Sequence, residues 1–325
     1  MPQSLVLSLE TQSTVLSKHL QGHALQQLFF TLVDTVDPEL GHVLRRDKKN
    51  CSYTLSAIQP GSISGSVSGS MPISIPNPDA SSEQFGKAKP ARKFHTNAAG
   101  NISFLQYAHT AILEAKAKCW WRISFLDDAL FDHLVFLWSQ LSNEIFPLGS
   151  ASVKIEHVFL ETPSTKWASS CSYRDLYEQA SAQERNIHLQ FITPAAFNIG
   201  ETITPLPTAD AVFQPLRKYW NRYSGLAFAP SLTSDIVPVA FDIQTQPVQT
   251  VLRNSFQTLT GCTGHISFRI GGSGDPLITK RINALTDFTG YCGIGINTRL
   301  GMGIVKRLQH SKIRAESGVT IRPTA

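Results

Sequence analysis

Cysteines, charged residues and long apolar runs are all scarce in this sequence of 325 residues. The five cysteines are far apart and form no CxxC pair or Cys/His ligand spacing, so neither a disulfide framework nor a structural zinc site is supported. No apolar run reaches about 18 residues, and the first residues lack the basic and apolar regions of a signal peptide. We therefore expect a cytoplasmic protein, without membrane insertion, in which most cysteines are small buried residues.

The proportions of apolar and charged residues are those of a folded protein. With 42% hydrophobic and 16% charged residues, the chain can bury a sizeable core and is unlike disordered, collagen-like or coiled-coil sequences. Domains usually contain roughly 100 to 200 residues, which predicts two of them here. We place the first at residues 1–165 and the second at residues 166–325.

Positive charge is concentrated in two places. From Asn254 to the end there are nine basic and three acidic residues, a net charge of +6 against +5 for the whole chain. A second cluster lies at residues 45–49. Because Lys and Arg neutralise phosphates and release condensed counterions, this distribution favours a polyanionic partner. An ordinary solvated basic face would have the same composition, so the charge alone leaves both interpretations open.

Hydrophobic periodicity in the first half predicts strands and helices in the order β-α-β-β-α-β. Residues 4–10 alternate as in a strand, and the spacing of apolar residues after Gly22 predicts a helix. Asp37 and Pro38 are typical of an N-cap and a first helical residue, so a short second helix should begin there. Further strands are expected at 51–58, 119–126 and 152–159, and a helix at 129–141. The order predicts a ferredoxin-like domain with a four-stranded sheet.

One stretch of the first half differs in composition from the rest. Residues 59–88 are rich in Ser, Gly and Pro, which predicts a flexible surface insertion.

The second half repeats the plan of the first, with strands at 187–191, 236–239 and 264–270, a glycine-bent strand within 293–308, and helices at 211–223 and 276–288. The fold class is therefore predicted to be α+β, with two tandem ferredoxin-like (RRM-like) domains. Such sheets can present splayed bases of single-stranded RNA to side chains.

The run GYCGIGINTRLGMG at residues 290–303 is the most specific local feature. Glycine allows close approach of the backbone to a ligand, and successive exposed amides can form an anion-binding concavity. Three cations flank the run, namely Arg299, Lys306 and Arg307. It is neither a P-loop nor a dinucleotide fingerprint, because the required spacing and context are missing. The alternative is a tight turn whose glycines pack on a neighbouring segment.

These residues carry a resemblance to a known family. Gly293, Gly295, Gly301 and Gly303 match the variant G-x-G-x(5)-G-x-G with which that family's C-terminal motif ends. The segments at 22–44, 172–176, 188–197 and 213–220 are similar as well. The chain resembles the CRISPR-associated endoribonucleases of the RAMP superfamily that cut precursor CRISPR RNA within its repeats. The resemblance extends over nearly the whole chain, except the insertion and the tail.

The resemblance implies a reaction without metal or cofactor. A ribose 2′-hydroxyl attacks the adjacent phosphate and leaves a 2′,3′-cyclic phosphate and a 5′-hydroxyl. Such chemistry needs a base, an acid, cations for the transition state and in-line geometry. The implied partners are CRISPR repeat RNA, whose crRNA product stays bound, and the other subunits of a multi-protein effector complex.

The sequence departs from the family pattern where the active-site histidine usually stands. Members place it after Pro-x-Leu-x-x-x-Leu, but here that stretch ends at Leu44 and the next residue is Arg45. His42 lies three residues earlier. Near the start, His23 and Gln26 stand where relatives carry Arg and His, and Phe30 shares their face and could stack a base. The candidate catalytic residues are His23, His42 and Arg45, with Arg46, Lys48, Lys49, Gly293, Gly295, Arg299, Gly301, Gly303, Lys306 and Arg307 as candidate RNA-binding residues.

Blander interpretations stay open for several of these residues. Each histidine taken singly also fits a capping or surface residue, and the other eight are expected in structural or surface roles. Trp120 and Trp121 are expected in the core. Because Arg45 replaces the usual histidine, a second function fits too: a subunit that binds repeat RNA and anchors the guide but cuts weakly or not at all. A third is a general basic RNA-binding protein without preference for the repeat.

Overall fold

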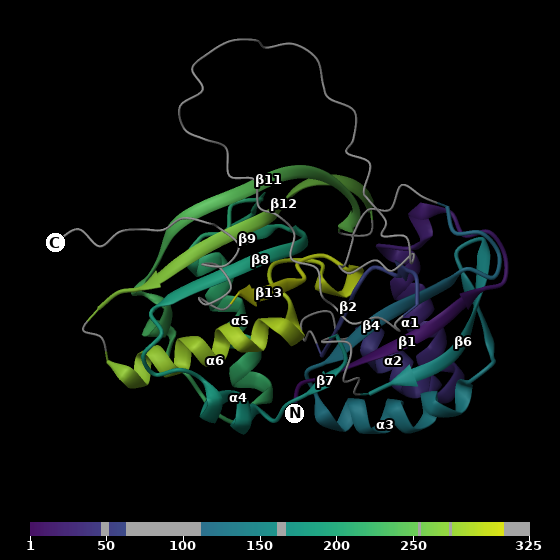
Figure 1. Ribbon diagram of the computed structural model, residues 1–325, viewed down its shortest axis with the longest axis horizontal. Helices are drawn as coiled ribbons and strands as arrows, with labels where there is room; N and C mark the ends of the chain where they lie inside the picture. The colour runs from purple at the N-terminus through teal and green to yellow at the C-terminus, as the bar shows by residue number, and fades with distance from the viewer. Residues whose placement is uncertain (47–51, 63–111, 161–166, 253–254, 273–274, 309–325) are drawn as a thin grey trace, which may run out of the picture.

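The computed structural model describes residues 1–46, 52–62, 112–160, 167–252, 255–272 and 275–308, which form two α+β halves lying side by side (Figure 1). Each half contains an antiparallel sheet backed by helices. Of the helices in these ranges, none is long and apolar enough to cross a membrane.

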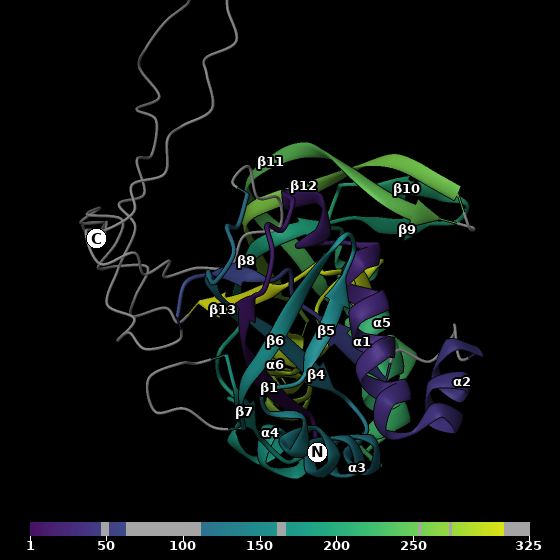
Figure 2. The ribbon, with the colours of Figure 1, turned by 90° about the vertical axis from the view of Figure 1, so that its right-hand side faces the viewer.

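The first half has the strand order of a ferredoxin-like domain. Its sheet runs β2-β4-β1-β6, with every neighbouring pair antiparallel, and β5 continues it beyond β6. α2 lies outside α1 at the edge of the molecule (Figure 2). The elements are β1 (Gln3–Thr11), α1 (His23–Val36), α2 (Pro38–Arg46), β2 (Tyr53–Leu55), β4 (Lys118–Phe125), α3 (Asp128–Trp138), β5 (Ile145–Leu148) and β6 (Ala151–Phe159), with the short pieces η1 (Ser17–His19), β3 (Gln59–Pro60), η2 (Ser139–Leu141) and β7 (Ser169–Ser170).

The second half repeats that order. Its sheet runs β11-β12-β8-β13, again antiparallel throughout, and both α5 and α6 contribute to the core beneath it. The elements are α4 (Tyr173–Gln179), β8 (Asn186–Ala195), β9 (Phe197–Ile199), β10 (Thr202–Thr204), α5 (Ala209–Tyr223), η3 (Pro230–Thr233), β11 (Ile236–Leu252), β12 (Ser255–Ile270), α6 (Pro276–Cys292), η4 (Thr298–Leu300) and β13 (Val305–Leu308). The predicted fold class of two tandem ferredoxin-like domains is confirmed.

The helix predicted from Gly22 and the helix start at Pro38 are both confirmed. In α1 the apolar side chains at the predicted positions form one buried stripe, which includes Leu25, Leu28 and Phe29. The carboxylate of Asp37 accepts a hydrogen bond from the amide of Leu40 at 2.9 Å, which is the N-cap contact that the sequence predicts. This cap fixes where α2 begins and therefore where its basic residues lie.

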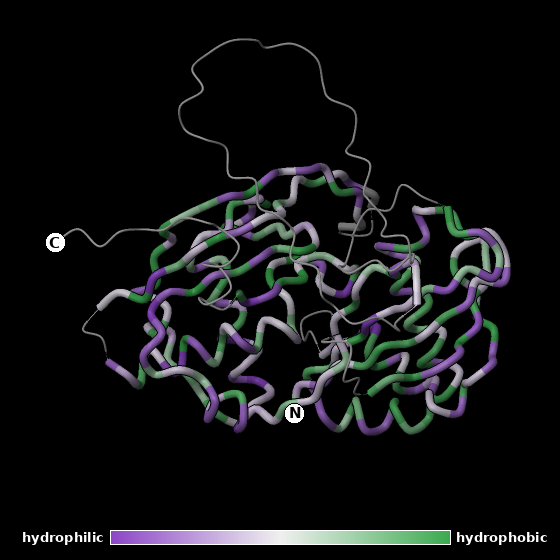
Figure 3. The backbone as a smooth tube through the Cα atoms, viewed as in Figure 1, coloured by the Kyte–Doolittle hydropathy of each residue, from purple (hydrophilic) through white to green (hydrophobic). Residues whose placement is uncertain are grey.

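Two large apolar cores and two smaller clusters lie within the described residues. Trp121 and Trp138 are fully buried in the first core, and Trp220 in the second. Hydrophobic and hydrophilic residues are interspersed along both halves (Figure 3), and burial alternates along much of β6 and β8, whereas β4 is buried on both faces. Trp120 is buried too, but with Val6 and Ile304 in a cluster that joins the two sheets. Both tryptophans are thus buried, as expected.

Several predicted boundaries are corrected. Gln59 and Pro60 do not belong to a flexible insertion, because they form β3 on β4 and Gln59 is buried, whereas residues 63–88 lie outside the described part of the chain. The expected domain boundary at 165 also falls outside it. The strands expected at 236–239 and 264–270 are the ends of one long hairpin. Of the stretch 293–308, only the last four residues form a strand.

Candidate nucleic-acid interface

The glycine-rich run forms a closed loop between α6 and β13. The amide of Ile294 donates to the carbonyl of Gly303 at 2.8 Å, which ties the two ends of the loop together. The amide of Gly303 donates to Pro194 at 2.9 Å and that of Ile296 to Ala196 at 2.8 Å, so the loop is also bound to the end of β8. These amides are used inside the protein. The expectation that they form an open phosphate cradle is therefore corrected.

Close packing explains why the run contains glycine. Gly295 and Gly303 have φ values of 88° and 69°, and a Cβ atom on either would collide with a carbonyl oxygen, that of Ala196 and that of Ile294 respectively. Gly301 and Gly303 are buried, and Gly293 and Gly295 are partly buried. The interpretation as a tight turn packed on a neighbour thus describes the local structure.

The loop meets the first half at the start of α1. The amide of Gly22 donates to the carbonyl of Leu300 at 3.2 Å, and the Arg299 guanidinium carbon lies 5.8 Å from the centre of the Tyr53 ring. His23, the first residue of α1, is exposed at this point. The helix N-terminus has no side-chain cap and no acidic residue in its first turn, so its positive end is not neutralised there.

Arg45 is held against α1 by two contacts. Both of its terminal nitrogens pair with the carboxylate of Asp34, Nη1 at 2.7 Å from Oδ1, and its guanidinium carbon lies 4.4 Å from the centre of the Phe30 ring. The hydrogen bonds that Arg45 donates to Asp34 raise the pKa of Arg45, so this residue is a permanent cation. Because Arg45 covers one face of Phe30, the expected role of that ring as a platform for a base is not supported.

The three candidate catalytic residues are spread along α1 and α2. Arg45 lies over Phe30, and Phe30 comes seven residues after His23 in α1. Seven residues correspond to a rise of about 10 Å along the helix, so Arg45 is not beside His23. His42 and Arg46 are exposed on α2. Among the described residues, no side-chain hydrogen bond or ion pair includes His23 or His42. Lys48 and Lys49 lie outside the described residues.

The C-terminal cations divide into two kinds. Arg307 pairs with Asp287 of α6 at 2.9 Å and donates to the carbonyl of Asn283, so it holds β13 to α6. Burial raises the pKa of Asp287, and the nearby Arg307 opposes that shift. Lys306 is exposed on β13, and Arg299 is partly buried at the loop. That Arg299 and Lys306 bind RNA stays a prediction.

Sequence analysis missed Asp34 and Tyr53. Asp34 could not be recognised because its partner Arg45 is eleven residues away on another helix, whereas sequence rules for helical ion pairs apply to residues three or four apart in one helix. Tyr53 stacks on Phe29 with ring centres 4.0 Å apart and lies beneath Arg299. One signal could have located Asp34. Gly41 is a glycine inside a short helix, and such a glycine indicates that a neighbouring side chain occupies the space of a Cβ atom, which here is the carboxylate of Asp34.

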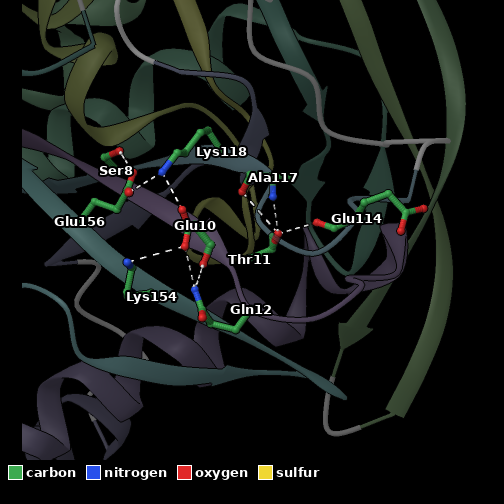
Figure 4. A network of polar contacts seen from close by, with 9 residues as sticks. All are labelled: Ser8, Glu10, Thr11, Gln12, Glu114, Ala117, Lys118, Lys154 and Glu156. Atoms are coloured by element: carbon green, nitrogen blue, oxygen red, sulfur yellow. Dashed lines mark hydrogen bonds and ion pairs between the residues drawn. The ribbon is translucent and has the colours of Figure 1, made fainter.

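The open face of the first sheet carries a separate polar network (Figure 4). Lys118 bridges the carboxylates of Glu10 and Glu156, and Lys154 lies 3.6 Å from Glu10. Hydrogen bonding from Lys118 lowers the pKa of Glu10 to about 2. In this part of the sheet positive charge is balanced by carboxylates.

Other histidines and cysteines fit the structural roles that were expected for them. His133 pairs with Asp37, His188 with Ser267 and His19 with Ser150. Cys119, Cys262 and Cys292 are buried and are not in disulfides. Within the described ranges no group of three or more His, Cys, Asp or Glu side chains could hold a metal ion.

The fold is that of a protein with two tandem ferredoxin-like domains and a glycine-rich loop at their junction. Two family models match the sequence: the CRISPR Cas6 N-terminal domain over residues 1–73 and 81–178, and the CRISPR-associated endoribonuclease Cas6 over residues 189–305. The chain belongs to the CRISPR-associated endoribonuclease Cas6 family.

Solved structures show the same fold over almost the entire chain. A Cas6 (TTHB231) product complex is 20% identical with a TM-score of 0.66, covering 95% of this chain and 100% of the other, and a further structure gives its organism as Thermus thermophilus. A Cas6 (TTHA0078) product complex is 18% identical with a TM-score of 0.65, covering 95% and 99%. A Cas6-related protein from Pyrococcus furiosus is 10% identical with a TM-score of 0.51, covering 95% and 100%. A comparison with curated proteins gave no match.

Proposed function

We propose that this protein cuts precursor CRISPR RNA within its repeats by attack of a ribose 2′-hydroxyl on the adjacent phosphate, giving 2′,3′-cyclic phosphate and 5′-hydroxyl ends. Membership of the Cas6 family supports cleavage of RNA. The observation that carries the proposal is the meeting of the exposed His23 with the Arg299 loop, joined by the hydrogen bond from Gly22 to Leu300.

The chemistry assigns distinct tasks to the groups at this place. Histidine suits proton transfer at neutral pH, so His23 acts on the 2′-oxygen or on the departing 5′-oxygen. The uncapped N-terminus of α1 and the guanidinium of Arg299 stabilise the charge that builds on the phosphate. His42, Arg45 and Arg46 continue the basic surface along α2. Arg45 stays protonated, so it contributes charge and does not act as a base.

The same basic residues support retention of the product in this proposal. Lys306 and Arg299 bind the RNA backbone next to the cut, and the repeat-derived end of the crRNA remains on the protein after cleavage. The partners in this proposal are repeat RNA and the other subunits of an effector complex. The reaction needs no cofactor, since every group it uses is a side chain, the helix terminus or the RNA itself.

One observation favours a second function, that of a subunit that binds repeat RNA without cutting it. Arg45 stands where relatives have histidine and is engaged by Asp34, and the side chains of His23 and His42 make no described contact with each other. If both histidines act only as surface residues, the protein keeps its RNA-binding surface and lacks an acid and base pair. In that case it anchors guide RNA for other subunits.

One assay separates these functions. Purified protein is incubated with end-labelled repeat RNA in EDTA, and the products are examined for a cyclic phosphate. We expect cleavage at one position, and none when the nucleotide before the cut carries a 2′-deoxy sugar. Tight binding without product would support the anchoring subunit. Equal affinity for unrelated hairpins would instead identify a general RNA-binding protein.

A further inference from the structure

Arg122 is a buried cation at the junction of the two halves. It lies within β4, and only 6% of its surface is exposed. Its neighbour Trp121 packs into the first core, whereas Trp120 belongs to the cluster that joins the two sheets. Because side chains alternate along a strand, Arg122 leaves the sheet on the same face as Trp120 and opposite to Trp121, and its contacts decide where its guanidinium points.

Three hydrogen bonds direct the guanidinium towards the junction. Nε donates to the carbonyl oxygen of Trp167, and Nη2 donates to Oγ of Ser4 and to the carbonyl oxygen of Gly290, all at 2.7 Å. Ser4 lies on β1, Trp167 precedes β7, and Gly290 lies in the last turn of α6 in the second half. Arg122 and Ser4 lie on the face of the first sheet that is opposite to the first core. Arg122 therefore connects this sheet to α6.

The charge of Arg122 is matched by the end of a helix. Burial lowers the pKa of Arg122 to about 10, which leaves it charged at neutral pH. No ion pair found within the described ranges includes it. α6 has 17 residues and no basic residue in its own last turn, so the negative end of its dipole faces a cation supplied by the other half.

Thr54 makes a second contact of the same kind. Its Oγ1 donates to the carbonyl oxygen of Tyr291 at 2.8 Å, and it lies on β2 beside β4. The last carbonyls of a helix have no partner within the helix and need one from elsewhere. The first half therefore satisfies two successive carbonyls at the end of α6. This end of the helix lies beside β2 and β4 (Figure 1).

The glycine-rich loop starts directly after this end of α6. Its first turn is at Gly293, and its far side meets α1 where Gly22 donates to Leu300. The first half thus holds the loop at two places, through Arg122 and Thr54 at its start and through Gly22 at η4. Any movement of the end of α6 would displace Arg299 relative to His23.

We propose that Arg122 is a positioning residue that fixes the glycine-rich loop, and with it Arg299, against His23 at the start of α1. This role rests on the proposed function, because RNA cleavage is what requires these groups to be aligned. Arg122 itself does not touch the RNA. Misplacement of a group by about 1 Å can cost about 10²-fold in rate, so a lost link at this point should be visible in the kinetics.

The test compares variants that differ in what they keep. Arg122→Met retains the length and apolar stem but loses the charge and all three donors, whereas Arg122→Lys retains the charge. Single-turnover cleavage is measured at saturating repeat RNA, well below the unfolding temperature. We expect Arg122→Met to be slower by about 10²-fold with nearly the same Kd for RNA, and Arg122→Lys to recover part of the rate. Thr54→Val should slow cleavage less than Arg122→Met. If Arg122→Met does not fold, Thr54→Val is the variant that tests the proposal.

Leu148→Ala is the matched control. Leu148 is fully buried in β5 at the far edge of the first sheet, so its loss destabilises the same half without touching α6. This variant should cleave at the normal rate. A folded Arg122→Met protein with the normal rate, or an equal slowing by Leu148→Ala, would overturn the proposal.

A second readout does not depend on cleavage. Hydrogen–deuterium exchange of the peptide spanning residues 290–303 should accelerate in Arg122→Met and stay unchanged in Leu148→Ala. If the unaltered protein binds repeat RNA but does not cut it, the proposed chemistry fails. The hydrogen–deuterium exchange of residues 290–303 then tests by itself whether Arg122 fixes the loop. Unchanged exchange in Arg122→Met would then reject the positioning role.

Discussion

Asp34 of α1 and Arg45 of α2 are joined by a two-point ion pair that lies over Gly41. A Cβ atom on Gly41 would collide with the carboxylate of Asp34 and would approach the Arg45 guanidinium to 3.0 Å. An exposed ion pair typically contributes only about 0–1 kcal/mol, so its main effect here is on geometry. It orients Arg45 over Phe30 and sets the packing of α2 on α1.

This arrangement predicts that Gly41→Ala is destabilising, although alanine is the better helix former. In the Asp34→Ala background the collision is gone, and the same substitution should instead stabilise the protein by up to about 1 kcal/mol. Urea unfolding of the four proteins in the cycle measures both effects. A stabilising Gly41→Ala in the presence of Asp34 would show that the ion pair does not occupy that space in solution.

The proposed acid and base residues make a kinetic prediction. His23→Ala should lower the cleavage rate by about 10²-fold or more with little loss of RNA affinity, because general acid–base groups act on the transition state. His42→Ala should also slow the reaction. His157→Ala, an exposed histidine on β6, is the control and should cleave normally. Should both helix variants keep the full rate, the histidine assignment is wrong while the family membership stands.

Local patterns were sufficient to predict most of the first half. The apolar stripe of α1 and the Asp37-Pro38 helix start depend on neighbours in sequence, and both are found as expected. The long hairpin of β11 and β12 was missed because β11 contains Pro238 and Pro247 and many polar residues. Proline is tolerated there because β11 is the edge strand of its sheet.

Contacts between distant segments explain what the sequence could not predict at the site. The glycines of the loop were compatible with a phosphate cradle or with close packing, and only the approach of Ala196 and Ile294 decides between them. Likewise, Arg307 looked like any other cation in a basic tail. Its partner Asp287 lies 20 residues earlier, and the fold alone brings the two together.

The C-terminal cations should therefore respond differently to substitution. Lys306→Ala and Arg299→Ala should weaken RNA binding and lower the slope of log Kd against log salt by about 0.7 for each lost contact to a single strand. Arg307→Ala should mainly destabilise the fold, by about 1–3 kcal/mol, because it leaves Asp287 without its partner. Salt titrations and urea unfolding distinguish the two effects. A full phosphate-type salt effect for Arg307→Ala would contradict its structural role.

The network around Glu10 predicts a dependence of stability on pH. Lys118 lowers the folded pKa of Glu10 from 4.5 to about 2, so its stabilising contribution is complete above about pH 4.5 and is lost as the pH falls towards 2. Urea midpoints of the unaltered protein should therefore decline through that range, and Glu10→Gln should decline less. Lys118→Met removes the main cause of the shift and should move the remaining Glu10 contribution to higher pH. If Glu10→Gln and the unaltered protein lose stability in parallel between pH 4.5 and 2, Glu10 is not bound to Lys118 in solution.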